Sequence, residues 1–342
     1  MKKVKIAVIG ARFGRNHIEG AIRSSNTDLV CFCDINEEYA KELSAEYKVP
    51  YVTDAEEIFQ NPEIEAVTIA LPDQIHAEMT IRALRAGKHV MCEKPMALKL
   101  EECKEMIRVS KETGKFLMVG QVCRFTPGFM RAKELVEAGE IGELFFAESE
   151  YAHDYSKMQA SWRFDPASPR HGLIGGGCHA VDLLRWICGN PTQVFGYSNR
   201  KVLKHWPTDD CVIALMEMPN DVKAKIFCSI GCKRNYTMRT VLYGTEGTII
   251  VDNTSNFLSL FKNKNGEEED FLGVPSKEVE IRIPIAVNNH NVGGEIHDFC
   301  ESILTGTPPA LSGAEGASTV SVCTAIIQSC ETNLPVTVDY GF

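Results

Sequence analysis

The sequence has no long apolar segment. None of its apolar stretches approaches the roughly 20 residues that a membrane-spanning helix needs. The apolar run in the N-terminal MKKVKIAVIG is too short for a signal peptide, and it meets a glycine instead of a cleavage site. We therefore expect a soluble, cytoplasmic protein.

The sequence also has no cluster of basic residues. Its 36 lysines and arginines are interspersed among 46 acidic residues, which gives a net charge of −10. A polyanion such as nucleic acid, or an anionic membrane surface, binds to a basic patch that neutralises its phosphates. The charge pattern therefore argues against nucleic acid and membrane partners.

Thirteen cysteines are present, but no two of them have the C-x-x-C spacing of a zinc site. The closest spacings are Cys31/Cys33 and Cys228/Cys232. The number is odd, and most of the cysteines lie in apolar segments such as LVCFCDI and KIFCSIGC. We expect reduced thiols in the core and no bound metal.

A chain of 342 residues is longer than one hydrophobic core usually organises, so we expect two domains. In residues 1–121, short β-branched segments alternate with longer amphipathic ones, which is typical of parallel βαβ units. This pattern predicts an α/β fold with a doubly wound parallel sheet, and Gly87 and Gly114 lie where helices are expected to end. The predicted strands are 5–9, 29–33, 66–70, 89–92 and 116–119, and the predicted helices are 16–24, 37–47, 55–60, 75–86 and 100–113.

Residues 122–342 have a different pattern, which predicts a second, α+β domain with a large and mostly antiparallel sheet. Strands dominate residues 193–283, and turn signals such as MPN separate them. The other expected elements are helices near 127–138 and 179–188, a strand at 144–151, and two closing helices that begin at Gly294 and Gly313.

The segment IGARFGRNH follows the first predicted strand. Glycine at such a turn lets backbone N–H groups approach a pyrophosphate at a helix N-terminus. The usual G-x-G-x-x-G spacing is absent, because Arg12 and Arg15 stand at two of its glycine positions and Gly14 indicates a shorter loop. We expect Gly10, Arg12, Phe13 and Gly14 to bind the dinucleotide.

Asp34 ends the second predicted strand. A carboxylate at this place can accept hydrogen bonds from an adenosine ribose, and it repels a 2′-phosphate. Ile35 and Asn36 follow, and neither is a cation that could receive that phosphate. NAD is therefore the expected cofactor, although the Arg12 side chain leaves NADP open.

A second motif, Glu93-Lys94-Pro95, ends another predicted strand, at the sheet edge where doubly wound folds bind ligands. Proline restricts the preceding residue to extended backbone geometry, so the Lys94 ammonium can be aimed across a cleft. Taken alone, such a tripeptide is more often a solvated charged turn.

The longer stretch LPDQIHAEMTIRALRAGKHVMCEKPMAL strongly resembles the Gfo/Idh/MocA oxidoreductases. The similarity continues through GQVCRFTPGFMRAKELVEAGEIGELFFAE, CHAVDLLRWICG, YGTEGTIIVDN and EIHDFCESILTGTPP, so it covers nearly the whole chain. The resemblance implies a Rossmann domain in residues 1–121 and a substrate-binding and oligomerisation domain in 122–342. It also implies hydride transfer at a sugar or polyol carbon and a homo-oligomer, either a dimer or a tetramer.

The resemblance also implies roles for particular residues. It places Lys94 beside the nicotinamide and the reacting hydroxyl, with Glu93 next to it. Pro72 and His76 match a loop that lines the cofactor in relatives. Arg124 matches a position near the substrate.

One departure from the family pattern stands out. Many relatives carry D-x-G-x-H-x-x-D, whereas this chain reads GGGCHAVD, so that Gly175 replaces the first aspartate. His179 remains, and we expect it at the start of a helix that faces the cleft. Asp182 follows one turn later, where it is as consistent with a packing or salt-bridge role as with a catalytic one.

Hydride transfer to NAD requires a group that takes the alcohol proton and a group that stabilises the oxygen. Histidine has an ordinary pKa of about 6.5 and lysine one of about 10.4, so His179 is the expected base. Lys94 is then the hydrogen-bond donor and electrostatic anchor, although desolvation could let it share the proton.

Several polar residues are candidates for substrate binding, with a polar surface loop as the alternative. His153, Asp154 and Tyr155 fall in a region that relatives use for the sugar site, together with Trp162 and Arg163. Of these, Trp162 and Arg163 best suit a pyranose ring, because they offer an aromatic face and a planar fork of donors. His290 either reaches the same cleft or caps a loop.

Three functions are consistent with these features. The first is an NAD-dependent dehydrogenase of a sugar or cyclitol. The second is a lyase or glycosidase that oxidises a glycoside transiently, eliminates its substituent and returns the hydride. The third is a catalytically silent NAD-binding sensor, against which the presence of Lys94 and His179 argues.

Overall fold

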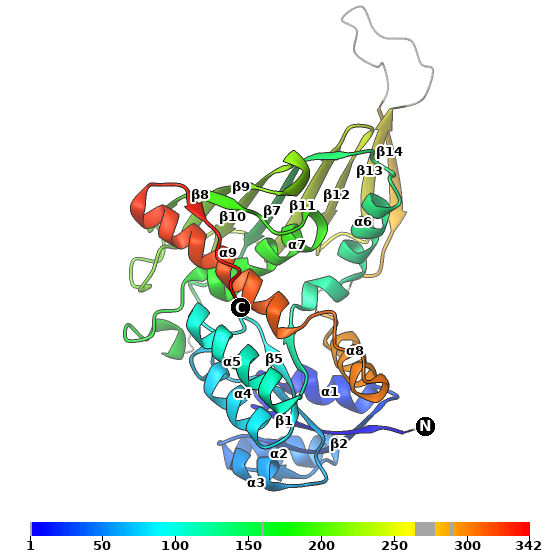
Figure 1. Ribbon diagram of the computed structural model, residues 1–342, viewed down its shortest axis with the longest axis vertical. Helices are drawn as coiled ribbons and strands as arrows, with labels where there is room; N and C mark the ends of the chain where they lie inside the picture. Colours follow the sequence, from blue (N-terminus) through cyan, green and yellow to red (C-terminus); the bar gives the residue numbers. More distant parts are fainter. Residues whose placement is uncertain (1, 159–160, 264–277, 288–289) are drawn as a thin grey trace, which may run out of the picture. The chain divides into compact units, whose positions relative to one another are not determined.

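The computed structural model describes residues 2–158, 161–263, 278–287 and 290–342 (Figure 1). Its internal contacts divide the chain into two compact units. Unit 1 comprises residues 1–122, 291–320 and 340–342, and unit 2 comprises 123–290 and 321–339.

Unit 1 is built on a six-stranded sheet in which every neighbouring pair is parallel, in the order β3-β2-β1-β4-β5-β6. This is the doubly wound order of a Rossmann fold, and it confirms the predicted fold class. Only the two-residue strand β3 was not predicted. The strands are β1 (Val4–Ile9), β2 (Thr27–Cys33), β3 (Tyr51–Val52), β4 (Ala66–Ile69), β5 (His89–Glu93) and β6 (Leu117–Gly120).

The helices of unit 1 begin and end where the local chemistry predicts. Asn36 caps α2 by accepting a hydrogen bond from the Tyr39 backbone N–H, and Asp54 caps α3 in the same way through Glu56. Gly114 ends α5 in the left-handed conformation, with φ of 66°. The helices are α1 (Arg15–Arg23), α2 (Glu37–Tyr47), α3 (Ala55–Gln60), α4 (His76–Arg85), α5 (Leu100–Thr113) and α8 (Val292–Thr305), with a 3₁₀ turn η1 (Asp73–Ile75) before α4.

Helix α8 comes from the C-terminal part of the chain but packs in unit 1, against α1. Two glycines allow this close approach, since a Cβ on Gly20 would lie 3.1 Å from the Cα of Gly293. The sequence pattern places all of 122–342 in one second domain, whereas the contacts assign 291–320 and 340–342 to unit 1.

Unit 2 is built on a nine-stranded sheet in the order β14-β13-β12-β11-β7-β10-β9-β8-β15. All its pairs are antiparallel except β7 with β10, which agrees with the predicted large, mostly antiparallel sheet. The strands are β7 (Leu144–Ala152), β8 (Gln193–Asn199), β9 (Cys211–Glu217), β10 (Lys223–Ser229), β11 (Thr237–Gly244), β12 (Gly247–Asp252), β13 (Phe257–Asn263), β14 (Glu278–Pro284) and β15 (Val336–Thr337).

Two helices pack on the sheet of unit 2: α6 (Pro127–Glu137) on β12 and β13, and α7 (Cys178–Cys188) on β7, β10 and β11. Strand β9 shows the resulting alternation, with Val212, Ala214 and Met216 buried and Ile213 and Leu215 exposed. A π-helical turn, η4 (Leu173–Gly177), leads into α7, and the last long helix, α9 (Gly313–Thr332), passes from unit 1 into unit 2. Within the described residues, no helix combines the length and the hydropathy needed to span a bilayer.

Gly10 illustrates how closely unit 1 is packed at the end of β1. Its φ is +92°, and a Cβ at this position would lie 2.4 Å from the backbone oxygen of Ala70. Gly114 also has a positive φ, +66°, but a Cβ there would meet nothing within 4 Å. A side chain at Gly114 would therefore add backbone strain alone, whereas a side chain at Gly10 would add both backbone strain and a steric collision.

We predict that Gly10→Ala lowers the free energy of unfolding by more than about 2 kcal/mol, because it adds a collision to the backbone strain. The matched variant Gly114→Ala should lower it by about 1 kcal/mol, because it adds strain alone. Urea titration of both variants measures the difference. Equal losses in the two variants would contradict the packing described for Gly10.

Candidate functional site

The residues predicted to bind the dinucleotide lie at one edge of the unit 1 sheet. Gly10 follows β1, Asp34 follows β2, and Glu93 is the last residue of β5. Because these strands are parallel members of one sheet, their carboxyl ends meet at the same edge. The chain therefore places both predicted motifs where such folds bind ligands.

The glycine turn is held by its own backbone. The Gly14 N–H donates to the Gly10 carbonyl at 2.8 Å, and Gly14 is the residue before α1. A Cβ on Gly14 would lie 2.5 Å from that same carbonyl oxygen, so the turn excludes a side chain there as well as at Gly10. Phe13, between them in the sequence, is 53% exposed.

The Asp34 carboxylate is fixed by two backbone donors. Arg12 N–H donates to Oδ2 at 3.2 Å and Asn36 N–H donates to Oδ1 at 3.0 Å. A carboxylate offers about four acceptor positions, so these two bonds leave acceptor capacity for a diol. The glycine turn and the start of α1 fit the pyrophosphate of NAD, because no side chain stands in the way at Gly10 or Gly14. The Asp34 carboxylate fits the ribose.

Glu93 is held by a buried histidine that the sequence patterns did not single out. His17 Nε2 lies 3.0 Å from Glu93 Oε1, and Glu93 Oε2 accepts the Lys94 backbone N–H at 3.0 Å. His17 is 1% exposed. Burial opposes the charge on Glu93, but the hydrogen bond and charge of His17, together with Lys94, outweigh it and lower the Glu93 pKa to about 2.

His76 holds the other side of the same turn. Its Nδ1 lies 2.8 Å from the Pro95 carbonyl and its Nε2 lies 2.9 Å from the Leu71 carbonyl. Both partners can only accept, so both ring nitrogens must carry protons. Burial lowers the His76 pKa, but Cys92, Asp73 and the Pro95 carbonyl outweigh it and raise the pKa to about 10.

His76 therefore ties together two loops at the edge of the sheet. One is the loop after β4, which contains Leu71 and Pro72, and the other is the Lys94–Pro95 turn, whose peptide bond is cis. Lys94 is partly buried, and it lies between the carboxylate held by His17 and the carbonyl held by His76.

We predict that His17→Ala destabilises the protein in a pH-dependent way. The folded-state pKa of Glu93 lies below its ordinary 4.5, so ionised Glu93 favours the folded state above pH 4.5, and this contribution is lost as the pH falls toward 2. Removing His17 raises the pKa of Glu93 and cancels the contribution. The difference in the free energy of unfolding between wild type and variant should be largest at neutral pH and shrink toward pH 2.

Chemical denaturation over this pH range measures the effect. His17→Gln is the matched variant, because it keeps a neutral donor for Glu93. It should retain part of the stabilisation. A loss in His17→Ala that does not vary with pH would show that His17 acts through packing alone.

In unit 2, His179 is the second residue of α7 and is 2% exposed. Its Nδ1 lies 3.2 Å from the Sγ of Cys123, in the 3₁₀ turn η2 (Val122–Phe125). Its ring stacks on Tyr151 with a centroid distance of 6.2 Å and contacts the His290 ring edge-on at 6.2 Å.

These rings belong to a larger group that we call the aromatic cluster, which consists of Tyr151, His153, Tyr155, His179, Tyr236 and His290. The Tyr151 hydroxyl lies 3.1 Å from His153 Nδ1 and 2.8 Å from the Tyr155 hydroxyl. Burial raises the pKa of both Tyr151 and Tyr236, so both remain neutral phenols. Three of the predicted substrate residues, His153, His179 and His290, thus come together around tyrosine rings.

Arg124 and Asp182 form a buried ion pair. Arg124 donates from Nε and Nη2 to the two carboxylate oxygens at 2.8 and 2.7 Å, and Arg185 approaches Oδ1 at 3.4 Å. Asp182 is 0% exposed. The ion pair is bidentate, and it joins η2 to α7.

Trp162 and Arg163 lie in another 3₁₀ turn, η3 (Ser161–Phe164). The Arg163 guanidinium lies 4.1 Å from the centroid of the Trp162 ring, and that of Arg170 lies 5.5 Å from it. The neighbouring Phe164 packs on Trp206, which in turn packs on Tyr155 of the aromatic cluster.

Arg170 also lies against the glycine at 175. A Cβ on Gly175 would lie 2.0 Å from the Arg170 Cζ, and Arg170 Nη2 donates to the Gly175 carbonyl at 2.8 Å. A buried guanidinium therefore occupies the space into which an aspartate at 175 would project.

The structure brings together two sets of predicted residues, one in each unit. Gly10, Arg12, Phe13, Gly14, Asp34, Pro72, His76, Glu93 and Lys94 lie in unit 1, and Arg124, His153, Trp162, Arg163, His179, Asp182 and His290 lie in unit 2. The sequence patterns missed His17, Cys123 and Tyr236. The one signal for His17 was its place in GRNH, a few residues after the glycine turn.

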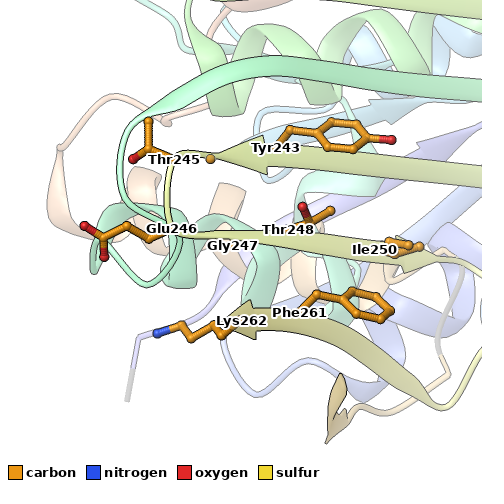
Figure 2. A pocket seen from close by; sticks show the side chains of 9 residues that line it. Tyr243, Thr245, Glu246, Gly247, Thr248, Ile250, Phe261 and Lys262 are labelled. Carbon is orange, nitrogen blue, oxygen red and sulfur yellow. The ribbon is translucent and has the colours of Figure 1, made fainter. Parts of the chain in front are cut away.

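A separate pocket of about 450 Å³ lies on the unit 2 sheet, around the turn between β11 and β12. Figure 2 shows Tyr243, Thr248 and Phe261 side by side on three adjacent strands, with Glu246 and Lys262 nearer the strand ends. None of the predicted site residues lines this pocket.

Comparison with known proteins yields two family matches. Residues 4–121 match the model described as "Oxidoreductase family, NAD-binding Rossmann fold", and residues 129–250 match the GFO/IDH/MocA C-terminal domain.

Curated relatives match over most of their lengths. The scyllo-inositol 2-dehydrogenase (NAD(+)) of Bacillus subtilis is 25% identical over 98% of this chain and 97% of that protein. The levoglucosan dehydrogenase of Pseudarthrobacter phenanthrenivorans is 27% identical over 86% of each. Among solved structures, a levoglucosan dehydrogenase in complex with NADH has the same fold, with a TM-score of 0.87 at 24% identity over 99% of this chain and 100% of that one.

Proposed function

Because the chain belongs to the Gfo/Idh/MocA family of NAD-binding oxidoreductases, we propose that it oxidises a hydroxyl carbon of a sugar, sugar derivative or cyclitol. The main support is the similarity to dehydrogenases named for inositol and levoglucosan, which covers 98% and 86% of this chain. The firmly held Glu93-Lys94-Pro95 turn and the histidines of the aromatic cluster supply polar groups suited to such a substrate.

The residues of unit 1 would hold NAD at the edge of the sheet. The glycine turn and the first N–H groups of α1 would bind its pyrophosphate, and Asp34 would accept hydrogen bonds from the adenosine ribose. When bound, NAD supplies the acceptor for the hydride.

We propose Lys94 and His179 as the two groups that act on the substrate oxygen. One takes the alcohol proton, and the other donates a hydrogen bond that stabilises the developing alkoxide. The ordinary pKa values favour histidine as the proton acceptor. The Lys94 ammonium starts from a turn whose neighbours are held by His17 and His76, which would keep its position well defined.

Other residues would orient the substrate. His153 and His290 can offer ring nitrogens from the aromatic cluster, and Trp162 with Arg163 offers an apolar face beside a cation. Arg124 would act through its ion pair with Asp182, which links η2 to the start of α7 and so positions His179.

The proposal is tested by incubating the enzyme with NAD and a panel of sugars, cyclitols and glycosides, and by following both NADH and the carbon product. We expect equimolar NADH and ketone with at least one cyclitol or sugar. Elimination of a glycoside substituent without net NADH, or no turnover with any member of the panel, would contradict it.

With the best substrate of that panel, Lys94→Ala should lower kcat by roughly 10²–10⁴-fold. NAD binding, followed by fluorescence, should remain measurable. Lys99→Ala is the matched control, because Lys99 is an exposed lysine five positions later in the chain. Undiminished turnover in Lys94→Ala would remove this lysine from the mechanism.

We further propose that a second copy of the chain covers the outer face of the unit 2 sheet. Tyr197 and Leu215 are 58% and 57% exposed, and Tyr197 lies opposite the exposed Ile213 in the register of β8 and β9. Charged residues on this face are paired within it, as Lys225 is with Glu148. The row of Tyr243, Thr248 and Phe261 in Figure 2 continues the same face.

An apolar and internally neutralised face of this kind suits a self-complementary interface. The double variant Tyr197→Lys/Leu215→Lys should convert the oligomer to a smaller species without loss of secondary structure, as measured by light scattering after size-exclusion chromatography. Leu334→Lys is the matched control, because Leu334 is 62% exposed but lies outside the sheet. A wild-type monomer, or an unchanged mass in the double variant, would refute the proposed interface.

We also propose a reducing, cytoplasmic location. All thirteen cysteines lie within the described residues, and none of them forms a disulfide. Reduced thiols in this number are typical of a cytosolic protein.

A further inference from the structure

Cys123 and His179 form a thiol–imidazole pair inside unit 2. The Sγ to Nδ1 distance is 3.2 Å, and the two residues are 1% and 2% exposed. Residue 175, where many relatives carry an aspartate, is a glycine in this chain, and the Arg170 guanidinium fills the space beside it.

The pair is held by its neighbours. Arg124, the residue after Cys123, makes the bidentate ion pair with Asp182, which lies one turn after His179 on α7. Tyr151 stacks on the imidazole and limits rotation of the ring. The thiol and the imidazole therefore meet in a defined orientation.

The Cys123 thiol has one proton, and its described contacts include two possible acceptors. One is His179 Nδ1, and the other is the Met238 Sδ at 3.5 Å. An imidazole nitrogen accepts hydrogen bonds well, whereas a thioether sulfur is a weak acceptor. The thiol proton should therefore point to Nδ1.

A neutral imidazole whose Nδ1 accepts a hydrogen bond must carry its own proton on Nε2. A carboxylate partner would have the opposite effect, because it can only accept and would hold the proton on Nδ1. The identity of the partner of Nδ1 thus decides whether Nε2 is a donor or an acceptor.

We propose that Cys123 is a positioning residue that holds His179 in its Nε2–H tautomer, so that His179 meets the substrate oxygen as a hydrogen-bond donor. This inference rests on the proposed contact of His179 with the substrate. It divides the tasks of the catalytic pair: His179 stabilises the oxygen, and the neutral form of Lys94 receives the alcohol proton. The ordinary pKa values alone favour the reverse division.

Nuclear magnetic resonance of protein labelled with ¹⁵N in its histidines tests the proposal, because ring nitrogens with and without a proton have distinct signals. His179→Gln identifies the His179 signals among those of the nine histidines. We expect the wild-type enzyme at neutral pH to show the Nε2–H pattern. An Nδ1–H pattern would overturn the proposal and assign His179 as the base.

Variants of Cys123 give a second readout. Cys123→Ser keeps a donor and should keep the Nε2–H pattern, whereas Cys123→Asp should shift the proton to Nδ1. Cys123→Ala should lower kcat by roughly 10-fold, the size expected when a group that orients a site residue is lost, with a smaller change in KM and partial recovery in Cys123→Ser. If Cys123→Asp fails to fold, the serine and alanine variants still decide the matter.

Cys188→Ala is the matched control, because Cys188 ends the same helix and is only partly buried. It should leave both the His179 signals and kcat unchanged. An unchanged tautomer and kcat in Cys123→Ala would overturn the role of Cys123 even if His179→Ala is inactive. An active His179→Ala enzyme, which has no donor at this position, would instead refute the proposed role of His179 itself.

Discussion

The buried hydrogen bond between His17 and Glu93 is the interaction on which the edge of the unit 1 sheet depends. It keeps a carboxylate charged at the end of β5, and that carboxylate holds the Lys94 backbone. His76 secures the following residue by donating to the Pro95 carbonyl. A flexible lysine side chain thus starts from a rigid turn, which limits the entropy lost when its amino group meets a substrate.

In unit 2, neighbouring contacts likewise hold a candidate site residue in place, but the groups that make them are different. Two successive residues of η2, Cys123 and Arg124, contact two residues one turn apart on α7, His179 and Asp182. The ion pair supplies rigidity, and the thiol is a weak hydrogen-bond partner of the imidazole. A buried guanidinium from Arg170 lies against Gly175, at the position where many relatives carry an aspartate.

Much of the fold and half of the candidate site could be predicted from local patterns. The bounds of α2, α3 and α5 follow from capping residues and periodicity, and Asp34 and Glu93 could be placed because parallel strands end at a common edge. The contact between Cys123 and His179 joins residues 56 positions apart. No spacing rule encodes such a contact, since it depends on how η2 packs on α7.

The most direct test of the whole account is a crystal structure of the enzyme with NADH and the substrate found in the panel. The account predicts that Lys94 Nζ and a ring nitrogen of His179 both lie about 3 Å from the same substrate oxygen, on the carbon that faces the nicotinamide. A complex in which only one of the two side chains reaches that oxygen, or in which the nicotinamide faces neither, would contradict it.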